Sequence, residues 1–361
     1  MVRVTVPVPG RSYDVTIGSG LLPNAGEHLP ALPAATTAFV VSDRRVADRY
    51  LEPLAGALAS RGLATVSLLV PEGEEAKTLQ AYESLLRQLA GREAHRDDVV
   101  IALGGGAVGD LAGFVASTYM RGLGLVQVPT TLLAQVDASV GGKTAVNLPE
   151  GKNLVGTFAQ PLAVVADIDT LATLDERDYR SGLSEVAKVS LTLDPELLAF
   201  LRDRAAAVVA RDPEAAEHVV ARCVAAKARI VGEDERDTGA RLVLNYGHTV
   251  GHALERLDAF RGRTHGEAIA VGMRAAAALA ERRGLGSELS SRTEDLLRAL
   301  GIEPVGPIPP AEDVVRCLRL DKKYRGGVRF VLLADVGDPL VIDDVSDEEI
   351  GAVLQEMGAA A

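Results

Sequence analysis

Residues 98–118 of this 361-residue chain read DVVIALGGGAVGDLAGFVAST. The stretch 98–103, apolar after its first residue, has the composition of a buried strand, and it leads into three glycines and then a helical stretch. Gly104, Gly106 and Gly109 follow the GxGxxG spacing, in the strand-turn-helix context that this motif requires. Glycine lets the backbone approach a pyrophosphate closely, and a helix N-terminus offers N–H donors. The stretch therefore predicts an α/β unit, with a nucleotide site as one interpretation of the loop and a tight turn as the other.

The glycine loop departs from the usual dinucleotide pattern in one respect. No acidic residue ends the next expected strand, 125–128, where it would hold a ribose. Asp43, after an earlier expected strand, would serve instead, as would the acidic loop 72–77. A nucleotide that lies across several strand ends would use all of these residues.

Hydrophobic patterning divides the chain near residue 175. Before it, short apolar strands alternate with helical stretches: a hairpin over 2–8 and 13–17, strands over 37–42 and 65–70, and a helix over 46–61. After it, apolar residues follow helical spacing to about residue 300. A segment rich in Pro and Gly, 301–310, then precedes a helix and two short strands, 328–333 and 339–342. We expect an α/β domain over 1–175 and a mostly helical domain over 176–361.

Composition narrows the class of partner. The net charge of −12 disfavours nucleic acid or an anionic membrane as a general partner, although local basic clusters would still allow an anionic small substrate. The two cysteines, Cys223 and Cys317, form no CxxC pair, which fits a reducing compartment. The N-terminus lacks a signal-peptide pattern, and no apolar run is long enough to cross a bilayer. We expect a cytoplasmic protein.

Lysine is scarce, and its positions are informative. Only seven of the 38 basic residues are lysine, and most of these follow glycines or lie near carboxylates. Lysine is a compact, tunable ammonium that arginine does not replace, although a compositional bias toward arginine would also leave a few lysines behind. Lys143 and Lys152 occur in GGKT and GKN, which suits a phosphate or nicotinamide contact. A P-loop is disfavoured, because Asp137 stands where its upstream glycine belongs.

Three of the six histidines occur within eighteen residues. His248 and His252 are four residues apart and would share a helix face, and His265 follows in an HGE sequence. Thr249 replaces the glutamate of the HExxH proteases, which disfavours that chemistry. Two imidazoles and a carboxylate such as Glu185 would leave an open position on zinc, as in catalytic sites.

Taken together, these motifs resemble the 3-dehydroquinate synthase family. The segments that carry the resemblance run in the family's order as far as residue 323: GGGAVGDLAGFVASTYMRG, VPTTLLAQVDASVGGKTAVN, GKNLVGTF, GLSEVAKVSL, LNYGHTVGHALE, HGEAIAVGM and DKK. The resemblance implies an NAD-binding α/β domain joined to a helical metal-binding domain. It also implies a homodimer in the cytoplasm.

The resemblance assigns residues to four roles. The metal ligands, for zinc or cobalt, would be Glu185, His248 and His265. The catalytic residues would be Lys188, His252, Asp137 and Asn245. The substrate would be bound by Arg121, Lys143, Asn153, Lys227, Asp237, Arg241, Lys322 and Lys323. The NAD site would be lined by Asp43, Glu72, Gly73, Glu74, Glu75, Lys77, Gly104, Gly105, Gly106, Ala107, Val108, Gly109, Asp110, Thr130, Thr131, Lys143, Lys152, Thr170, Leu171, Ala172 and Thr173.

The implied reaction is the shikimate-pathway conversion of 3-deoxy-D-arabino-heptulosonate 7-phosphate to 3-dehydroquinate and phosphate, on the route to aromatic amino acids. NAD is reduced and restored within each cycle. The family usually has Glu where this chain has Asp237, which leaves open a related cyclase that uses another sugar phosphate. Retention of Arg241 and Asn245 favours a substrate with a carboxylate. A metal-dependent polyol dehydrogenase and a non-catalytic sensing module are further alternatives.

Overall fold

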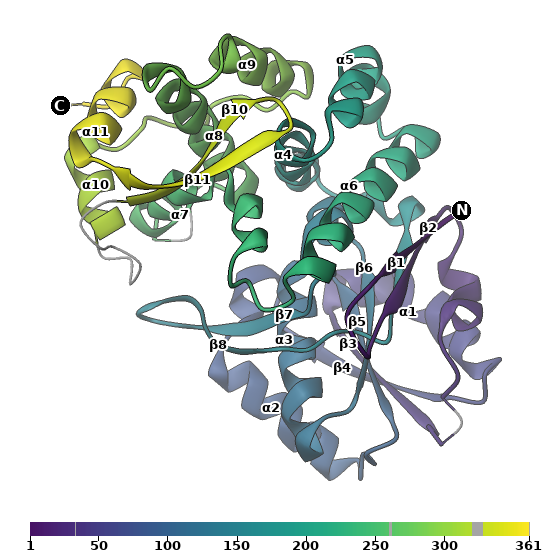
Figure 1. Cartoon of the computed structure of the whole chain (residues 1–361). Coiled ribbons are helices and arrows are strands. Elements are labelled where there is room, and N and C mark those ends of the chain that lie inside the picture. The colour runs from purple at the N-terminus through teal and green to yellow at the C-terminus, as the bar shows by residue number, and fades with distance from the viewer. Residues whose placement is uncertain (33, 260–261, 320–327, 361) are drawn as a thin grey trace. The chain divides into compact units, whose positions relative to one another are not determined.

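A computed structural model gives the fold of the chain, and it describes residues 1–32, 34–259, 262–319 and 328–360 (Figure 1). Lys322 and Lys323, which the family resemblance assigns to the substrate site, lie outside the described residues. The chain forms two compact units. The first unit comprises Met1–Asp175 with Ala216–Arg236, and the second comprises Glu176–Ala215 with Asp237–Ala361.

The first unit is built on a seven-stranded sheet, counted over the described residues, in the order β1-β2-β9-β6-β5-β3-β4. The strands are β1 (Val2–Val6), β2 (Tyr13–Gly18), β3 (Thr37–Asp43), β4 (Ala64–Val70), β5 (Val99–Gly104), β6 (Gly124–Pro129) and β9 (Ala163–Asp167). β1 and β2 pair antiparallel, which confirms the predicted hairpin, and every other neighbouring pair is parallel. A parallel sheet brings the carboxyl ends of its strands to one edge, where doubly wound folds bind their ligands.

Alternate residues of the strands enter two separate cores. On β3, Phe39 and Val41 pack with α2 (Leu79–Gly91) and α3 (Gly106–Thr118). Their neighbours Ala38 and Val40 instead belong to the cluster that includes Leu54 and Leu58 of α1 (Arg44–Ala59). Burial on both faces explains why these strands read as unbroken apolar runs.

The segment after β6 forms more regular structure than the sequence predicts. Residues Ala134–Ala138 form a single π-helical turn, η4, and β7 (Lys143–Leu148) pairs antiparallel with β8 (Gly151–Phe158) in a separate two-stranded sheet. The sequence predicts only connections here, because its glycines and polar residues mask the strand alternation. The hairpin fixes the spacing of the GGK and GKN lysines.

Helix α6 (Pro213–Glu233) does not follow the predicted domain division. Most of it belongs to the first unit, whereas the sequence places all of 176–361 in the second domain. Glu217 pairs with the N-terminal amine, and Glu235, just beyond the helix, accepts a hydrogen bond from Arg11 at 2.6 Å. Gly232 lies so close to Pro7 that an added Cβ would meet its ring at 2.6 Å. Helical periodicity does not reveal which core a helix joins.

The second unit is mostly helical. Its helices are α4 (Glu176–Thr192), α5 (Pro195–Val209), α7 (His248–Leu257), α8 (His265–Arg282), α9 (Leu289–Ala299), α10 (Ala311–Arg319) and α11 (Asp347–Glu356). The predicted C-terminal strands are present as the antiparallel pair β10 (Val328–Asp335) and β11 (Asp338–Val345). None of the helices in the described part of the chain combines the length and apolar composition that a membrane crossing requires.

Glycines let α7 and α8 pack closely. A Cβ on Gly272 would lie 1.8 Å from the carbonyl oxygen of Gly247, and one on Gly251 would lie 2.6 Å from Ile269. Gly247 itself caps α7 with a φ of +79°, a left-handed conformation that favours glycine. This packing brings the first turns of α7 and α8, which carry the histidines, together.

Candidate functional site: a buried carboxylate and two histidines

Glu185, His248 and His265 converge within the second unit. Each offers one ligand atom, and these three atoms lie within 4.8 Å of one another. The Oε1 atom of Glu185 lies 3.6 Å from Nε2 of His248 and 3.5 Å from Nε2 of His265. Glu185 is 1% exposed and stands in the middle of α4, so its carboxylate is held inside the unit.

Several contacts hold the start of α8 in place, and they explain why the sequence reads HGE at residues 265–267. His265 is the first residue of the helix, and Thr264 and Glu267 form a capping box around it. Arg177 of α4 binds both carboxylate oxygens of Glu267, at 2.8 and 2.7 Å. Gly266 leaves room for α4, because a Cβ there would lie 2.1 Å from the carbonyl oxygen of Ser181. The position of His265 therefore depends on the contact between α4 and α8.

The ionisable groups of the cluster shift one another's pKa values. Burial opposes ionisation of Glu185, but the charge of Lys188 and the two imidazoles hold the pKa of Glu185 well below its usual range. Burial and the nearby Lys188 ammonium hold the pKa of His248 well below its usual range, so the ring stays neutral and one of its nitrogens keeps an available lone pair. Burial lowers the pKa of His265, yet contacts with Glu185 and Glu255 outweigh that effect and raise it to about 10.

The donor set fits a divalent metal such as zinc. Neither oxygen of Glu185 makes a hydrogen bond within the described part of the chain, although Lys188 forms an ion pair with Oε2. A buried carboxylate oxygen that faces two imidazole nitrogens at 3.5 and 3.6 Å, longer than an ordinary hydrogen bond, is the arrangement that an ion would complete. Two nitrogens and one oxygen also leave a coordination position open for a ligand.

Other predicted residues of the second unit lie near this cluster in the chain. His252 is on α7, one turn after His248, with ring centroids 5.2 Å apart, and it is exposed. Arg241, which is buried, and Asn245 belong to the short helical turn η6 (Ala240–Asn245). Glu255, to which the sequence assigned no role, also contacts His265. The sequence does contain a signal for Glu255: it lies seven residues after His248, which places both on the same face of α7.

In the first unit, predicted NAD residues follow the carboxyl ends of five parallel strands. Asp43 ends β3, the acidic loop follows β4, Gly104 ends β5, Thr130 follows β6, and Thr170 follows β9. In the sheet register, Asp43 pairs with Val70 and Gly104 pairs with Pro129, so the strands end together. The structure thus places these segments at one edge of the sheet.

The glycine loop leads into an uncapped helix. Helix α3 starts at Gly106, and its N-cap residue, Gly105, has no side chain to bind the first N–H groups. Asp43, by contrast, caps α1 by accepting a hydrogen bond from the Val46 amide at 2.9 Å. The glycines also serve packing, because a Cβ on Gly109 would meet Gln127 at 2.8 Å. A helix start that no side chain caps suits an anion.

Several predicted residues of the first unit bind each other. The Nζ atom of Lys77, which is 3% exposed, donates to Asp110 at 2.6 Å and to Asn153 at 2.5 Å. Burial raises the pKa of Asp110 despite the opposing charge of Lys77. Lys152 lies 3.9 Å from Glu74. These contacts join the acidic loop, the start of α3 and the GKN strand.

Lys227 joins α6 to the π-helical turn. Its Nζ atom donates to the carbonyl oxygen of Asp137 at 2.6 Å and to Oδ1 of the same residue at 2.7 Å. Lys227 is 6% exposed. No local sequence signal marked this lysine, since its partner lies 90 residues away.

Left-handed backbone conformations mark three other predicted residues. Arg121, Asn153 and Asp237 have φ values of 69°, 56° and 60°. Non-glycine residues pay a steric cost for this conformation, and such residues concentrate at functional sites. Lys143 is exposed at the start of β7.

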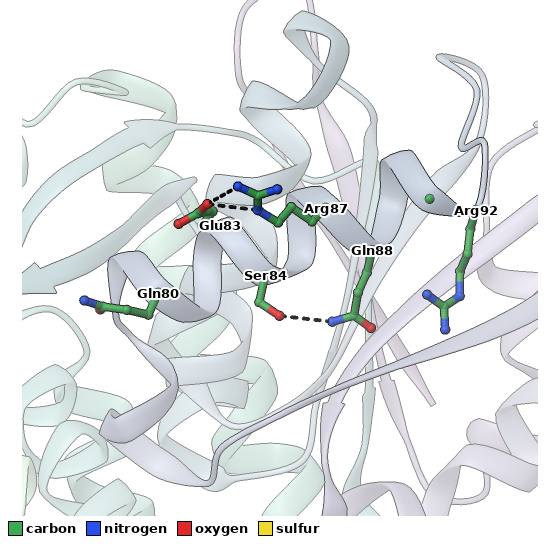
Figure 2. Close-up of a pocket in the computed structure, with 7 residues that line it drawn as sticks. Gln80, Glu83, Ser84, Arg87, Gln88 and Arg92 are labelled. Atoms are coloured by element: carbon green, nitrogen blue, oxygen red, sulfur yellow. Dashed lines mark hydrogen bonds and ion pairs between the residues drawn. The ribbon is translucent and has the colours of Figure 1, made fainter.

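An open surface hollow of about 560 Å³ lies away from these residues, along α2 (Figure 2). It is lined by Gln80, Glu83, Ser84, Arg87, Gln88, Gly91 and Arg92. Figure 2 shows that Arg87 binds Glu83 and that Gln88 binds Ser84, so these polar groups are satisfied along one helix. The hollow contains no predicted site residue.

Comparison with known proteins identifies the family. Models of the N-terminal and C-terminal parts of 3-dehydroquinate synthase match residues 67–181 and 182–324. The 3-dehydroquinate synthase of Halorhodospira halophila is 46% identical over 350 residues, which cover 96% of this chain and 97% of that protein. A 2-deoxy-scyllo-inosose synthase solved with carbaglucose-6-phosphate, NAD+ and Co2+ is 30% identical, with a TM-score of 0.90 over 98% of this chain and 99% of that one.

A second solved structure is similar. The 2-epi-5-epi-valiolone synthase of Streptomyces hygroscopicus, with NAD+ and Zn2+ bound, is 31% identical and has a TM-score of 0.86, with 96% of each chain covered. Family models over most of the chain and a relative this similar over nearly its whole length agree with the motifs and the site. The chain belongs to the 3-dehydroquinate synthase family.

Proposed function

We propose that this chain is a 3-dehydroquinate synthase, a carbon–oxygen lyase that converts 3-deoxy-D-arabino-heptulosonate 7-phosphate to 3-dehydroquinate and phosphate. The observation that carries the proposal is the convergence of Glu185, His248 and His265 in a chain with curated synthase relatives. NAD and a divalent zinc or cobalt ion are its cofactors, as in related solved structures.

Glu185, His248 and His265 would hold the metal. When bound, the metal would supply Lewis acidity toward a substrate hydroxyl, and NAD would supply a reversible hydride acceptor. Lys188 keeps Glu185 ionised as a ligand, since its ammonium lies against the carboxylate in a buried setting. We assign His252 and Asn245 to positioning the substrate beside these ligands.

NAD binding is assigned to the sheet edge of the first unit. The N–H groups at the start of α3, which no side chain caps, would bind the pyrophosphate, and Asp43 and the acidic loop would bind ribose hydroxyls. Lys77 holds Asp110 and Asn153 in place rather than extending into solvent. Thr130, Thr131 and the turn Thr170–Thr173 complete the proposed NAD site.

Cationic residues are assigned to the phosphate and carboxylate of the substrate. They are Arg121, Lys143, Lys227, Arg241, Lys322 and Lys323, and the polar residues Asn153 and Asp237 accompany them. The reaction proceeds through several steps on one flexible molecule, and fixed cations limit its motion between steps. Lys227 additionally fixes Asp137, which we assign a catalytic role.

A direct assay tests the proposed function. Purified protein with NAD and zinc or cobalt should release phosphate from the heptulosonate phosphate, form 3-dehydroquinate, and accumulate no net NADH. Parallel reactions with glucose 6-phosphate and with simple polyols test a related cyclase and a dehydrogenase. Turnover of another sugar phosphate alone would identify a related cyclase instead. Net NADH formation from a polyol would identify a dehydrogenase.

We further propose that the enzyme is a cytoplasmic homodimer. Family membership supports a dimer, and the two cysteines, which form no disulfide, suit a reducing compartment. Light scattering coupled to size-exclusion chromatography measures the assembly directly. A mass near 38 kDa rather than twice the chain's 37.8 kDa would contradict the dimer.

A further inference from the structure

Glu255 is a buried acid beside the proposed metal site that no assignment so far uses. It is 4% exposed and lies on α7, seven residues after His248 and three after His252. Its Oε2 atom lies 3.3 Å from Nδ1 of His265, within hydrogen-bond distance. The contact lies entirely within the second unit.

The two nitrogens of His265 face two different carboxylates. Nε2 faces Glu185, the proposed ligand, at 3.5 Å, and Nδ1 faces Glu255. An ionised carboxylate only accepts hydrogen bonds, so Glu255 holds a proton on Nδ1, and a bound ion would take the place of the second proton, on Nε2. The same contact fixes the rotation of the ring.

His248 is oriented in a parallel way by a different kind of acceptor. Its Nδ1 lies 3.2 Å from the carbonyl oxygen of Tyr246, while its Nε2 faces Glu185. A main-chain carbonyl persists through any substitution at Tyr246, whereas the acceptor for His265 is a side chain. A carboxylate partner also makes the ligating nitrogen more basic than a carbonyl does. The strength of the site therefore depends on residue 255.

We propose that Glu255 is a positioning residue that fixes the tautomer and ring orientation of His265 and so strengthens metal binding. This inference rests on the ligand set of the proposed function.

A second ion is the competing interpretation, because ligand atoms of His252, Glu255 and His265 also lie within 4.8 Å of one another. That ion would bind Nδ1 of His265 while Nε2 binds the first, which would require the ring to lose both protons. A neutral imidazole keeps one proton and resists losing it. The geometry therefore favours a hydrogen bond from Nδ1 over a second site.

Metal titrations of the full-length protein test the role of Glu255. Glu255→Gln keeps the shape and an acceptor oxygen but removes the charge, and Glu255→Ala removes the acceptor. We expect each variant to bind one zinc ion per chain, with a Kd about 10-fold higher for Gln and up to about 100-fold higher for Ala. A chromophoric chelator in competition measures the Kd, and circular dichroism establishes that the variants are folded.

Glu281→Gln is the matched control, because Glu281 accepts hydrogen bonds from Ser290 in the same unit and contacts no proposed ligand. Its zinc Kd should equal that of the unaltered protein. Long-range 1H–15N spectra of the zinc-loaded protein give a second measurement, in which His265 should carry its proton on Nδ1. That resonance should shift in Glu255→Gln.

Three results would overturn the inference: unchanged zinc affinity in both Glu255 variants, a proton on Nε2 of His265, or two ions per chain that fall to one in Glu255→Ala. Failure of the proposed function looks different. In that case the unaltered protein would bind zinc normally and still leave the heptulosonate phosphate intact.

Discussion

At the scale of single residues, the proposed chemistry depends on buried charges held by specific partners. Lys188 lies against Glu185, and Lys227 donates twice to Asp137. The sequence predicted that both lysines matter, but it did not reveal the partner of Lys227, because that contact spans 90 residues. Glu255 was missed for a related reason: a glutamate on a helix is ordinary until its burial is known.

Replacement of these lysines by arginine should reduce turnover strongly. Lys188 and Lys227 are 1% and 6% exposed, and a planar guanidinium has neither the room nor the geometry of an ammonium there. We expect Lys188→Arg and Lys227→Arg each to lower kcat/KM about 100-fold while the far-UV spectrum is retained. Arg87→Lys, on the exposed face of α2, is the control and should leave kcat/KM unchanged. Near-normal turnover in both site variants would refute the assignment.

At the scale of elements, the sequence predicted the types of most helices and strands but not their packing. The hairpin of β1 and β2 and the shared helix of His248 and His252 were predicted correctly, because each has a clear local period. The hairpin of β7 and β8 was not, since more than half of its strand residues are glycine or polar. The glycines between α7 and α8 are explained only by close backbone contact, which no local pattern shows.

Two Gly→Ala substitutions in helices of the second unit should have opposite effects. A Cβ at Gly272 would lie 1.8 Å from a backbone oxygen, whereas one at Gly351 would have nothing within 4 Å. Gly272→Ala should therefore lower the free energy of unfolding by about 1–3 kcal/mol and weaken zinc binding, because α7 and α8 must separate. Gly351→Ala should raise it by about 0.5–1 kcal/mol. Urea unfolding measures both changes in the free energy of unfolding. Equal changes in the two variants would contradict the close contact between α7 and α8.

The ion pair between Arg283 and Glu349, in the first turn of α11, should make the second unit sensitive to acid. Hydrogen bonds from Arg283 lower the pKa of Glu349 from 4.5 to about 2, against a smaller opposing effect of burial. Its folded-state pKa lies below the unfolded value, so its contribution is full above about pH 4.5 and disappears as the pH falls to about 2. Glu349→Gln should cost about 1 kcal/mol at pH 7, a modest value because the pair is partly exposed. In urea titrations, the loss of unfolding free energy in Glu349→Gln should be smaller near pH 3 than at pH 7.

At the scale of the whole molecule, the two units carry different proposed cofactors, and their stabilities should respond separately. Zinc binds only the folded second unit in this scheme, so zinc at 1,000 times its Kd should stabilise that unit by about 4 kcal/mol. Calorimetry with and without a chelator should show this shift, and Glu185→Gln should abolish it. An unchanged transition in the unaltered protein would contradict the metal site.

The path of α6 has a consequence for any attempt to divide the gene. The chain leaves the first unit after Asp175, returns to it from Ala216 to Arg236, and then leaves again. A cut at residue 175 would yield a nucleotide-binding fragment without Lys227, the partner of Asp137. Recombination between relatives at that point would join an α6 from one parent to a sheet from another. Crossovers that preserve the enzyme must therefore take Met1–Asp175 and Ala216–Arg236 from the same parent.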